Sequence, residues 1–237
     1  SAPLMARGAS CCCTEIKAAV LEQARQGRVR SIVTRFRTPA PAVARRVVPE
    51  LLGAGCSLLE LDLSRLGLHG MNELNGTWAR FFGEAAVCSA VLRKLGMSYN
   101  KLSGPLPELR LPALQELDLS INQWTGGLEP LQGCTALKKL VLLGPSLLTG
   151  GLEPLKGCAA LQTLYLAENH LTGNLEPLRG CTALQKVYLG NNHLTGDLES
   201  LQGCTLLMHL SLLGNKNLVP TDEDKAHFEK QGAVILT

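Results

Sequence analysis

Two histidines have the residue type and spacing that could hold a metal ion. His170 and His193 occupy equivalent positions in two similar segments, and stacking of those segments would place the imidazoles about 5 Å apart. Imidazole nitrogen is a common ligand of Zn²⁺. The residue at this position varies along the chain, so the sequence favours solvent-facing turn residues over a metal site.

Four glutamates share another repeated position and would form a column of stacked carboxylates. They are Glu129, Glu153, Glu176 and Glu199. Lys156 and Arg179 follow two of them by three residues and can offset the repulsion between like charges. Because exposed ion pairs contribute little to stability, we expect a solvated edge at this position.

The motifs of common enzyme classes are missing from the sequence. It contains no phosphate-binding glycine-rich loop, no His-Glu-x-x-His, no nucleophile elbow and no Cys-x-x-Cys pair. The glycine-rich turns recur at regular spacing, which indicates a role in repeat geometry. We therefore expect a protein that is not an enzyme and binds no metal or cofactor.

The elements that position these side chains are copies of one unit. Leu171-Thr172-Gly173 recurs as Leu194-Thr195-Gly196, a lag of 23 residues, and a fixed lag of this size marks a repeat architecture. Each unit contains Leu-x-x-Leu-x-Leu-x-x-Asn-x-Leu. Seven units begin at Leu58, Leu92, Leu114, Leu137, Leu161, Leu184 and Leu207. The asparagine position holds Asn100, Asn122, Asn169, Asn192 and Asn215, but Leu66 in the first unit and Pro145 in the fourth.

This pattern, over about residues 56–219, resembles the leucine-rich repeat family. The second half of each unit, Leu-Thr-Gly-x-Leu-Glu-Pro-Leu-x-Gly-Cys, is similar to the plant-type class, with Leu-Glu-Pro in place of Ile-Pro, and to arrays of unicellular algae. The resemblance implies an α/β repeat fold, a solenoid with a parallel concave β-sheet and helical N- and C-terminal caps. It also implies binding of protein partners through the concave face.

Simple physical rules assign the positions within a unit. Side chains alternate along the short Leu-x-Leu strand, so the leucines point inward and the residues between them point outward. The asparagine side chain is expected to bond the backbone of its own turn and of the next. Glycine permits the tight bend, and the prolines exclude a regular helix from the returning segment, which is expected to be extended or to form helical turns.

The repeats divide the chain into four parts. We expect a flexible N-terminus over 1–13, a helical N-terminal cap over 14–55 that includes a strand near 29–36, the seven-unit solenoid over 56–219 with an insertion at 71–87, and a C-terminal cap over 220–237. In the last part, Thr221 and Asp222 begin a helix through Gln231 that places Phe228 against the end of the core, and a final strand or extended tail runs through 233–236.

Charge and cysteine usage limit the partners and the compartment. The net charge of +3 is too small to indicate nucleic acid binding, and no apolar run is long enough to suggest a membrane span, although peripheral association with a membrane complex stays open. The nine cysteines are an odd number, and four of them recur at one core position: Cys134, Cys158, Cys181 and Cys204. We expect reduced, buried thiols and an intracellular reducing compartment, the cytoplasm or an organelle interior such as a plastid.

The outward positions of the strands indicate where a partner would bind. Their N-terminal half is small and acidic. The C-terminal half has a contiguous patch of Val141, Leu143, Tyr165 and Tyr188, flanked by Lys139, Lys186 and Glu168. Exposed aromatic and aliphatic side chains of this kind form binding hot spots, so we expect a protein–protein interaction module. The alternatives are a scaffold subunit of a large organellar complex, bound through its basic N-terminal segment and the insertion, and a secreted receptor or inhibitor ectodomain.

Overall fold

The structure is a computed structural model that describes residues 31–33, 59–65, 91–109 and 111–237, with the backbone alone for 31–33. The expected flexible segment at 1–13, most of the N-terminal cap at 14–55 and the insertion at 71–87 lie outside these ranges. Within the cap, the strand expected near 29–36 is confirmed as β1.

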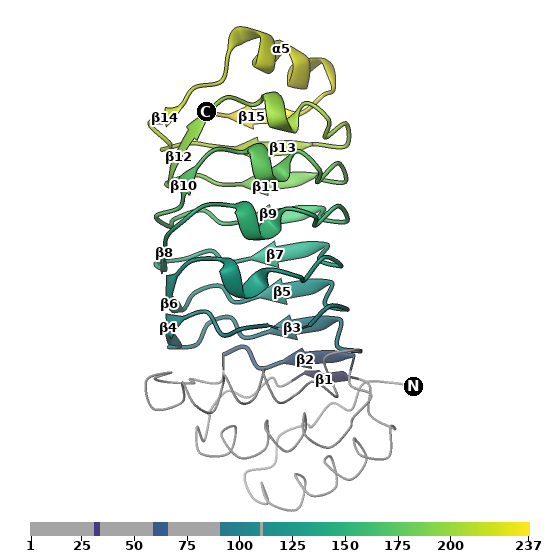
Figure 1. The fold of residues 1–237 in the computed structure, drawn as a ribbon, viewed down its shortest axis with the longest axis vertical. Coiled ribbons are helices and arrows are strands. Elements are labelled where there is room, and N and C mark those ends of the chain that lie inside the picture. The colour runs from purple at the N-terminus through teal and green to yellow at the C-terminus, as the bar shows by residue number, and fades with distance from the viewer. Residues whose placement is uncertain (1–30, 34–58, 66–90, 110) are drawn as a thin grey trace, which may run out of the picture.

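Nine short parallel strands form one sheet along the stack of repeats (Figure 1). Each of the seven units contributes one strand, and β1 and β15 add one at either end. The strands, in sheet order, are β1 (Ser31–Val33), β2 (Glu60–Asp62), β3 (Lys94–Gly96), β5 (Glu116–Asp118), β7 (Lys139–Val141), β9 (Thr163–Tyr165), β11 (Lys186–Tyr188), β13 (His209–Ser211) and β15 (Val234–Leu236). Equivalent residues of successive units are paired in register, which confirms the predicted solenoid.

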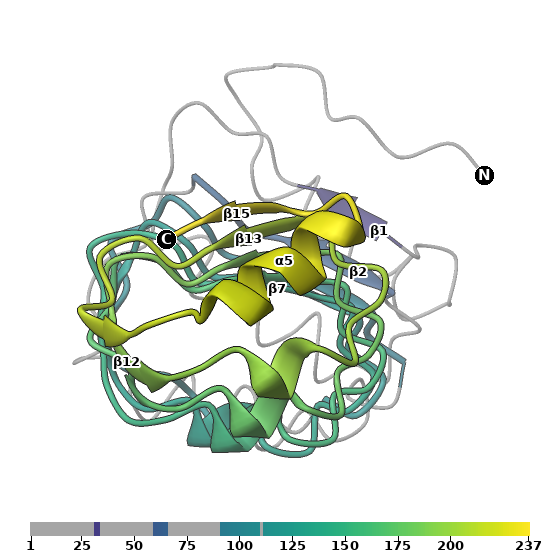
Figure 2. The same cartoon turned by 90° about the horizontal axis from the view of Figure 1, so that it is seen from above.

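Among the described residues, a shorter flank strand completes each of units two to seven, and a single 3-10 turn is added in units three to six. Three-stranded parallel sheets form one flank, from β4 (Ser103–Pro105), β6 (Gln123–Gly126) and β8 (Leu147–Leu148), and from β10 (Thr172–Gly173), β12 (His193–Gly196) and β14 (Asn217–Leu218). Opposite the main sheet lie the 3-10 helices η2 (Glu129–Leu131), η3 (Glu153–Leu155), η4 (Glu176–Leu178) and η5 (Glu199–Leu201) (Figure 2). Proline occupies the first turn of three of these helices, where its missing N–H leaves no bond unmade.

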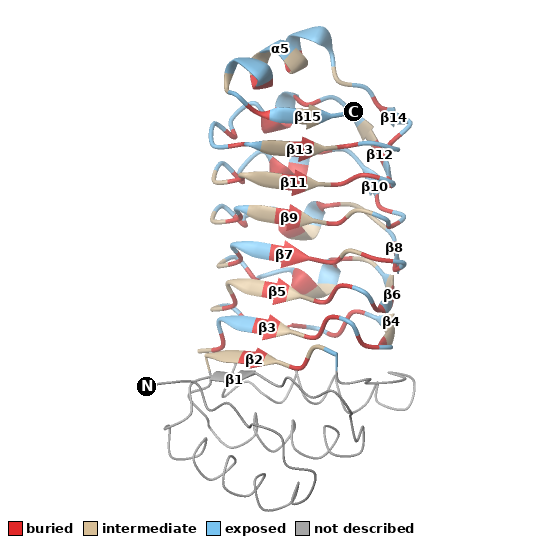
Figure 3. Cartoon of the chain, turned by 180° about the vertical axis from the view of Figure 1, so that it is seen from behind, coloured by how far each residue is buried: buried red, intermediate tan, exposed pale blue. Residues whose placement is uncertain are grey.

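The core is a stack of leucines enclosed between the main sheet and the 3-10 helices. In the main sheet, the central residue of every strand from β2 to β13 is buried (Figure 3), and Leu166 and Leu189, which follow β9 and β11, are both 0% exposed. The four repeated cysteines are buried and free, as predicted. Their thiols lie 3.3 to 3.9 Å from backbone carbonyl oxygens of the preceding unit.

Buried asparagines connect each unit to the one before it. The side-chain amide nitrogen of Asn192 donates to the carbonyl of Leu189 in its own unit, at 2.9 Å, and to that of Leu166 in the preceding unit, at 3.0 Å. The equivalent pattern holds for the other four: Asn100, Asn122, Asn169 and Asn215. In the fourth unit Pro145 is exposed, and the next residue, Ser146, is buried in place of the asparagine.

A helix closes the C-terminal end of the core as predicted. Helix α5 (Asp222–Lys230) has Thr221 as its N-cap, whose hydroxyl accepts from the backbone N–H of Asp224 at 3.0 Å. The carboxylate of Asp224 accepts in return from the backbone N–H of Thr221 at 3.0 Å, which completes a capping box. Phe228 is 0% exposed and covers the last leucines. Strand β15 then pairs with β13.

Candidate protein-binding surface

Two tyrosines meet on the face of the main sheet that points away from the 3-10 helices, called here the sheet face. Tyr165 and Tyr188 are paired residues of β9 and β11. Their rings meet edge to face, with centroids 4.6 Å apart and an angle of 82° between the planes, and both side chains are partly buried. Burial, and then the neighbouring Tyr188, raise the pKa of the Tyr165 phenol. The hydroxyl of Tyr165 therefore stays protonated at neutral pH and can donate a hydrogen bond.

The residues predicted to surround the tyrosines differ in how far they are exposed to solvent. Leu143 is partly buried, Lys186 is partly buried, and Lys139 and Glu168 are exposed. The prediction that Val141 is exposed is wrong, because it is only 6% exposed. Val141 lies in register between Asp118 and Tyr165, both of which have longer side chains. We define the tyrosine patch as Leu143, Tyr165, Tyr188, Lys139, Lys186 and Glu168.

The N-terminal half of the sheet face is neutralised by its own contacts. Lys94 lies between two carboxylates of adjacent strands, 3.0 Å from Glu116 and 3.7 Å from Glu60. A hydrogen bond to Glu116, opposed in part by desolvation, raises the pKa of Lys94. Asp118 accepts from the backbone N–H and the hydroxyl of Ser120, at 3.0 and 2.6 Å. These charges are therefore already satisfied within the protein.

The C-terminal half differs because its lysines are unpaired. Lys139 and Lys186 have no ion-pair partner within the part of the chain that the structure describes. They share one column of the sheet, on either side of Thr163, beside the column that carries the tyrosines. An aromatic pair bordered by two unpaired ammonium groups is complementary to an apolar side chain with carboxylates beside it.

Sequence reasoning missed a second group of exposed side chains on the turns that follow the strands. Tyr99 is 52% exposed, and the guanidinium of Arg65 lies 4.6 Å from the centroid of its ring. Both residues have positive φ, at 61° for Arg65 and 54° for Tyr99, as does Ile121 at 52°. The repeat places this conformation at the residue that precedes the asparagine. Tracking that position unit by unit, beyond the strand itself, would have found the group.

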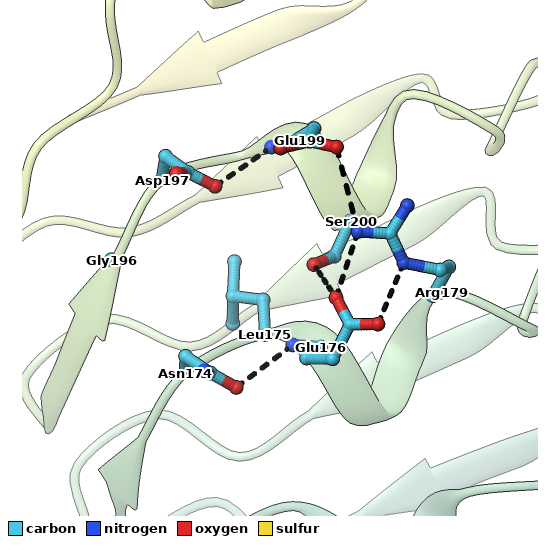
Figure 4. Close-up of a pocket in the computed structure, with 8 residues that line it drawn as sticks. All are labelled: Asn174, Leu175, Glu176, Arg179, Gly196, Asp197, Glu199 and Ser200. Carbon is cyan, nitrogen blue, oxygen red and sulfur yellow. Dashed lines mark hydrogen bonds and ion pairs between the residues drawn. The ribbon is translucent and has the colours of Figure 1, made fainter.

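The glutamate column contains a polar pocket that is occupied by the protein's own groups. The pocket, of about 200 Å³, is lined by Asn174, Leu175, Glu176, Arg179, Gly196, Asp197, Glu199 and Ser200 (Figure 4). Arg179 donates to both carboxylate oxygens of Glu176, at 2.7 and 2.9 Å, and lies 3.6 Å from Glu199. These bonds to Arg179, with one from the Ser200 hydroxyl at 2.9 Å, lower the pKa of Glu176. The arrangement joins two units and leaves few groups for a ligand.

Comparison with known proteins agrees with this architecture. The sequence profile of leucine-rich repeats (two copies) matches residues 159–203. Taken with the seven in-register units, that match identifies the repeats. The chain is a leucine-rich repeat solenoid. No sequence among curated proteins matches it.

Solved leucine-rich repeat structures superpose on the chain. A pollen receptor kinase 3 structure is 28% identical, with a TM-score of 0.53 over 67% of this chain and 74% of that one. The complex PEPR1-AtPEP1 is 21% identical, with a TM-score of 0.64 over 92% of this chain. An internalin from Listeria monocytogenes is 16% identical, with a TM-score of 0.57 over 92% of this chain. The chain spans 29% of the PEPR1 structure and 63% of the internalin.

The repeat match and the fold suggest a general role in protein binding. Leucine-rich repeat domains bind proteins, and they are typically interaction modules without enzymatic activity. Among the described residues, none of the helices has the length and apolar character needed to cross a membrane.

Proposed function

We propose that this protein binds a protein partner on the sheet face, through the tyrosine patch. The observation that carries the proposal is the contrast between the two halves of that face. Lys94 is held by Glu60 and Glu116 in the N-terminal half, whereas the tyrosine patch presents its aromatic rings beside two lysines without ion-pair partners among the described residues. A partner therefore finds free charge and apolar surface together at only one of these two places.

The tyrosines are suited to act as anchors. Tyrosine supplies a large apolar area with a polar end and loses little conformational entropy on binding. The contact between Tyr165 and Tyr188 restricts both rings before a partner arrives, so less ordering is required at binding. Lys139 and Lys186 select the partner by charge, because the carboxylates of an acidic segment would find no competing acid attached to either ammonium group.

The test compares the proteins captured by purified wild-type chain and by patch variants from an extract of the source organism, with crosslinks mapped by mass spectrometry. The patch variants are Y165A/Y188A and K139E/K186E. The matched controls are Tyr99→Ala, an exposed tyrosine outside the patch, and Lys216→Glu, an exposed lysine on another surface. The proposal expects one protein that wild type and controls capture and that both patch variants lose.

Once the partner is isolated, its binding free energy can be measured with each variant. Y165A/Y188A should weaken its binding by more than about 2 kcal/mol, as expected for a pair of hot-spot residues. Equal capture by all variants would contradict the proposal. Crosslinks concentrated on Lys17 and Lys225, to many subunits of one complex, would instead support a scaffold subunit bound through its ends.

We also propose a reducing compartment for this protein. The supporting observation is the column of four free, buried cysteines, each beside a carbonyl of the preceding unit. Thiols in such a column serve as small core residues and need no disulfide. Thiol counting by alkylation and mass spectrometry of the protein from its source should find these four reduced; paired cysteines there would favour a secreted receptor ectodomain.

A further inference from the structure

The flank of the solenoid brings two imidazoles into direct contact. Nδ1 of His170 lies 3.4 Å from Nε2 of His193. The ring centroids are 5.6 Å apart and the planes are inclined by 24°. The centroid separation exceeds the nitrogen–nitrogen distance by about two ring radii, so the rings meet edge to edge through these nitrogens. The two nitrogens therefore face each other, and both become available as ligands when the shared proton leaves.

The backbone fixes this arrangement at both residues. The N–H of His170 donates to the carbonyl of Leu148 at 2.8 Å, and the N–H of His193 donates to that of Leu171 at 2.8 Å. Each histidine is thus tied to the preceding unit by the same ladder of bonds. Both side chains are exposed, so an ion can reach them from solvent without opening the core.

The nitrogen–nitrogen distance matches that of two ligands on one metal ion. Two imidazole nitrogens at about 2.0–2.1 Å from Zn²⁺, with a tetrahedral angle between them, are about 3.3–3.4 Å apart. The observed 3.4 Å agrees with this value, and a turn of both rings away from the line that joins the two nitrogens would aim their lone pairs at the ion. A neutral imidazole pair without metal is held by one N–H···N hydrogen bond, which the ion would replace.

We propose that His170 and His193 form a two-histidine site for a divalent transition-metal ion, of the group Zn²⁺, Ni²⁺ and Cu²⁺. Imidazole suits these ions and not Mg²⁺ or Ca²⁺, which prefer oxygen ligands. Within the described residues, no cluster of three or more histidine, cysteine or acidic side chains surrounds the site. Water completes the coordination, and the ion bridges two adjacent units of the solenoid.

Substitution by glutamine is a conservative test of the site. Gln123 occupies the equivalent position two units earlier and is exposed there, so glutamine is compatible with this turn. His170→Gln and His193→Gln each remove one ligand, and H170Q/H193Q removes both. His209→Gln is the matched control, since His209 lies on β13 in the main sheet and away from this flank.

Metal binding is measured by calorimetric titration of Ni²⁺ and Zn²⁺ into tag-free, chelator-treated protein. The double variant supplies the background from other groups, the cysteines included. Above that background, wild type and His209→Gln should bind one ion per chain, with affinity about tenfold or more above that of either single variant. The same ions should raise the Tm of wild type more than that of H170Q/H193Q. Equal affinity in wild type and double variant, or no binding to wild type, would overturn the proposal.

A measurement on the unaltered chain keeps the test independent of variant folding. In NMR spectra of wild type, Zn²⁺ should shift the imidazole signals of His170 and His193 together, at the same metal concentration. Those of His209 and His227 should stay in place. Mg²⁺ at equal concentration should leave all four unchanged. Shifts at His209 or His227 without shifts at His170 and His193 would place the ion elsewhere and exclude the site.

Discussion

The ring of Tyr165 meets the ring of Tyr188 edge to face on the sheet face, with centroids 4.6 Å apart. The two residues are 23 positions apart in sequence and are brought together by the register of β9 with β11. Edge-to-face contact places the positive ring edge of one tyrosine against the negative face of the other. The contact therefore has a stabilising energy of its own in addition to any role in binding.

That energy should appear in a double-mutant cycle on folding. We expect Tyr165→Leu and Tyr188→Leu to be non-additive, with a coupling of about 0.5–1.5 kcal/mol in the free energy of unfolding. Leucine retains apolar bulk, so the cycle isolates the ring–ring contact. Urea unfolding of the two single variants, the double variant and wild type measures it. Additive effects would show that the rings do not interact in solution.

The inward and outward positions of the strands should differ sharply in mutational cost. Leu166→Ala and Leu189→Ala remove side chains that are 0% exposed, and each should lower the free energy of unfolding by about 2–5 kcal/mol. Leu143→Ala alters a partly buried residue of the sheet face and should cost about 1 kcal/mol or less. Denaturant titration of the three variants compares them directly. Equal losses for all three would mean that the assigned faces are wrong.

Much of this arrangement is predictable because a repeat of fixed length converts sequence position into spatial position. The burial of Leu166 and the adjacency of Tyr165 and Tyr188 both follow from the alternation of side chains and the lag between units. The C-terminal helix follows from the acidic residues beside Thr221 and from a following glycine, Gly232.

Other features of the surface depend on neighbours and not on register. The face of Val141 was predictable, but its burial depends on the residues in register with it, Asp118 and Tyr165. The left-handed conformation of Tyr99 is set by its repeat position before the asparagine and not by its residue type, because tyrosine does not favour that conformation. The contact between His170 and His193 depends on side-chain rotamers, which periodicity does not specify.

The asparagine column should contribute unequally to stability. Asn192 donates to two units and its carbonyl oxygen accepts from the backbone N–H of Leu171 at 3.0 Å. The carbonyl oxygen of Asn169 has no hydrogen-bond partner among the described residues. We therefore expect Asn192→Ala to lower the free energy of unfolding by about 1–3 kcal/mol more than Asn169→Ala does, because it also leaves the buried backbone N–H of Leu171 without an acceptor. Thermal and urea unfolding compare the pair, and an equal or smaller loss for Asn192→Ala would contradict this account.

The buried cysteines should be unreactive in the folded protein. Burial, and then the neighbouring Cys158 and Cys204, raise the pKa of Cys181 to about 12, and burial raises that of Cys204 to about 11. Because the thiolate is the reactive form, both should resist iodoacetamide at pH 8 until the solenoid unfolds. Mass-spectrometric mapping with and without urea measures this. Rapid labelling of Cys181 in the native protein would show that the units separate readily.

Acid should weaken the C-terminal cap through Asp224. Burial alone would raise the pKa of this carboxyl, but hydrogen bonds from Thr221 and Gln202 outweigh burial and lower it. A carboxylate whose pKa is lower in the folded state stabilises that state above its unfolded pKa of about 3.9, and this stabilisation is lost as the pH falls through the folded value. Asp224→Asn should therefore lower the free energy of unfolding by about 0.5–2 kcal/mol near pH 7, and the difference from wild type should shrink below about pH 4.

This effect of Asp224→Asn is measured by hydrogen exchange of the α5 and β15 amides, together with unfolding at several pH values. Asp222→Asn is the control, because this side chain is fully exposed and pairs only loosely with Lys225, at 3.6 Å. A pH-independent difference between Asp224→Asn and wild type would show that the carboxyl acts by shape and not by charge.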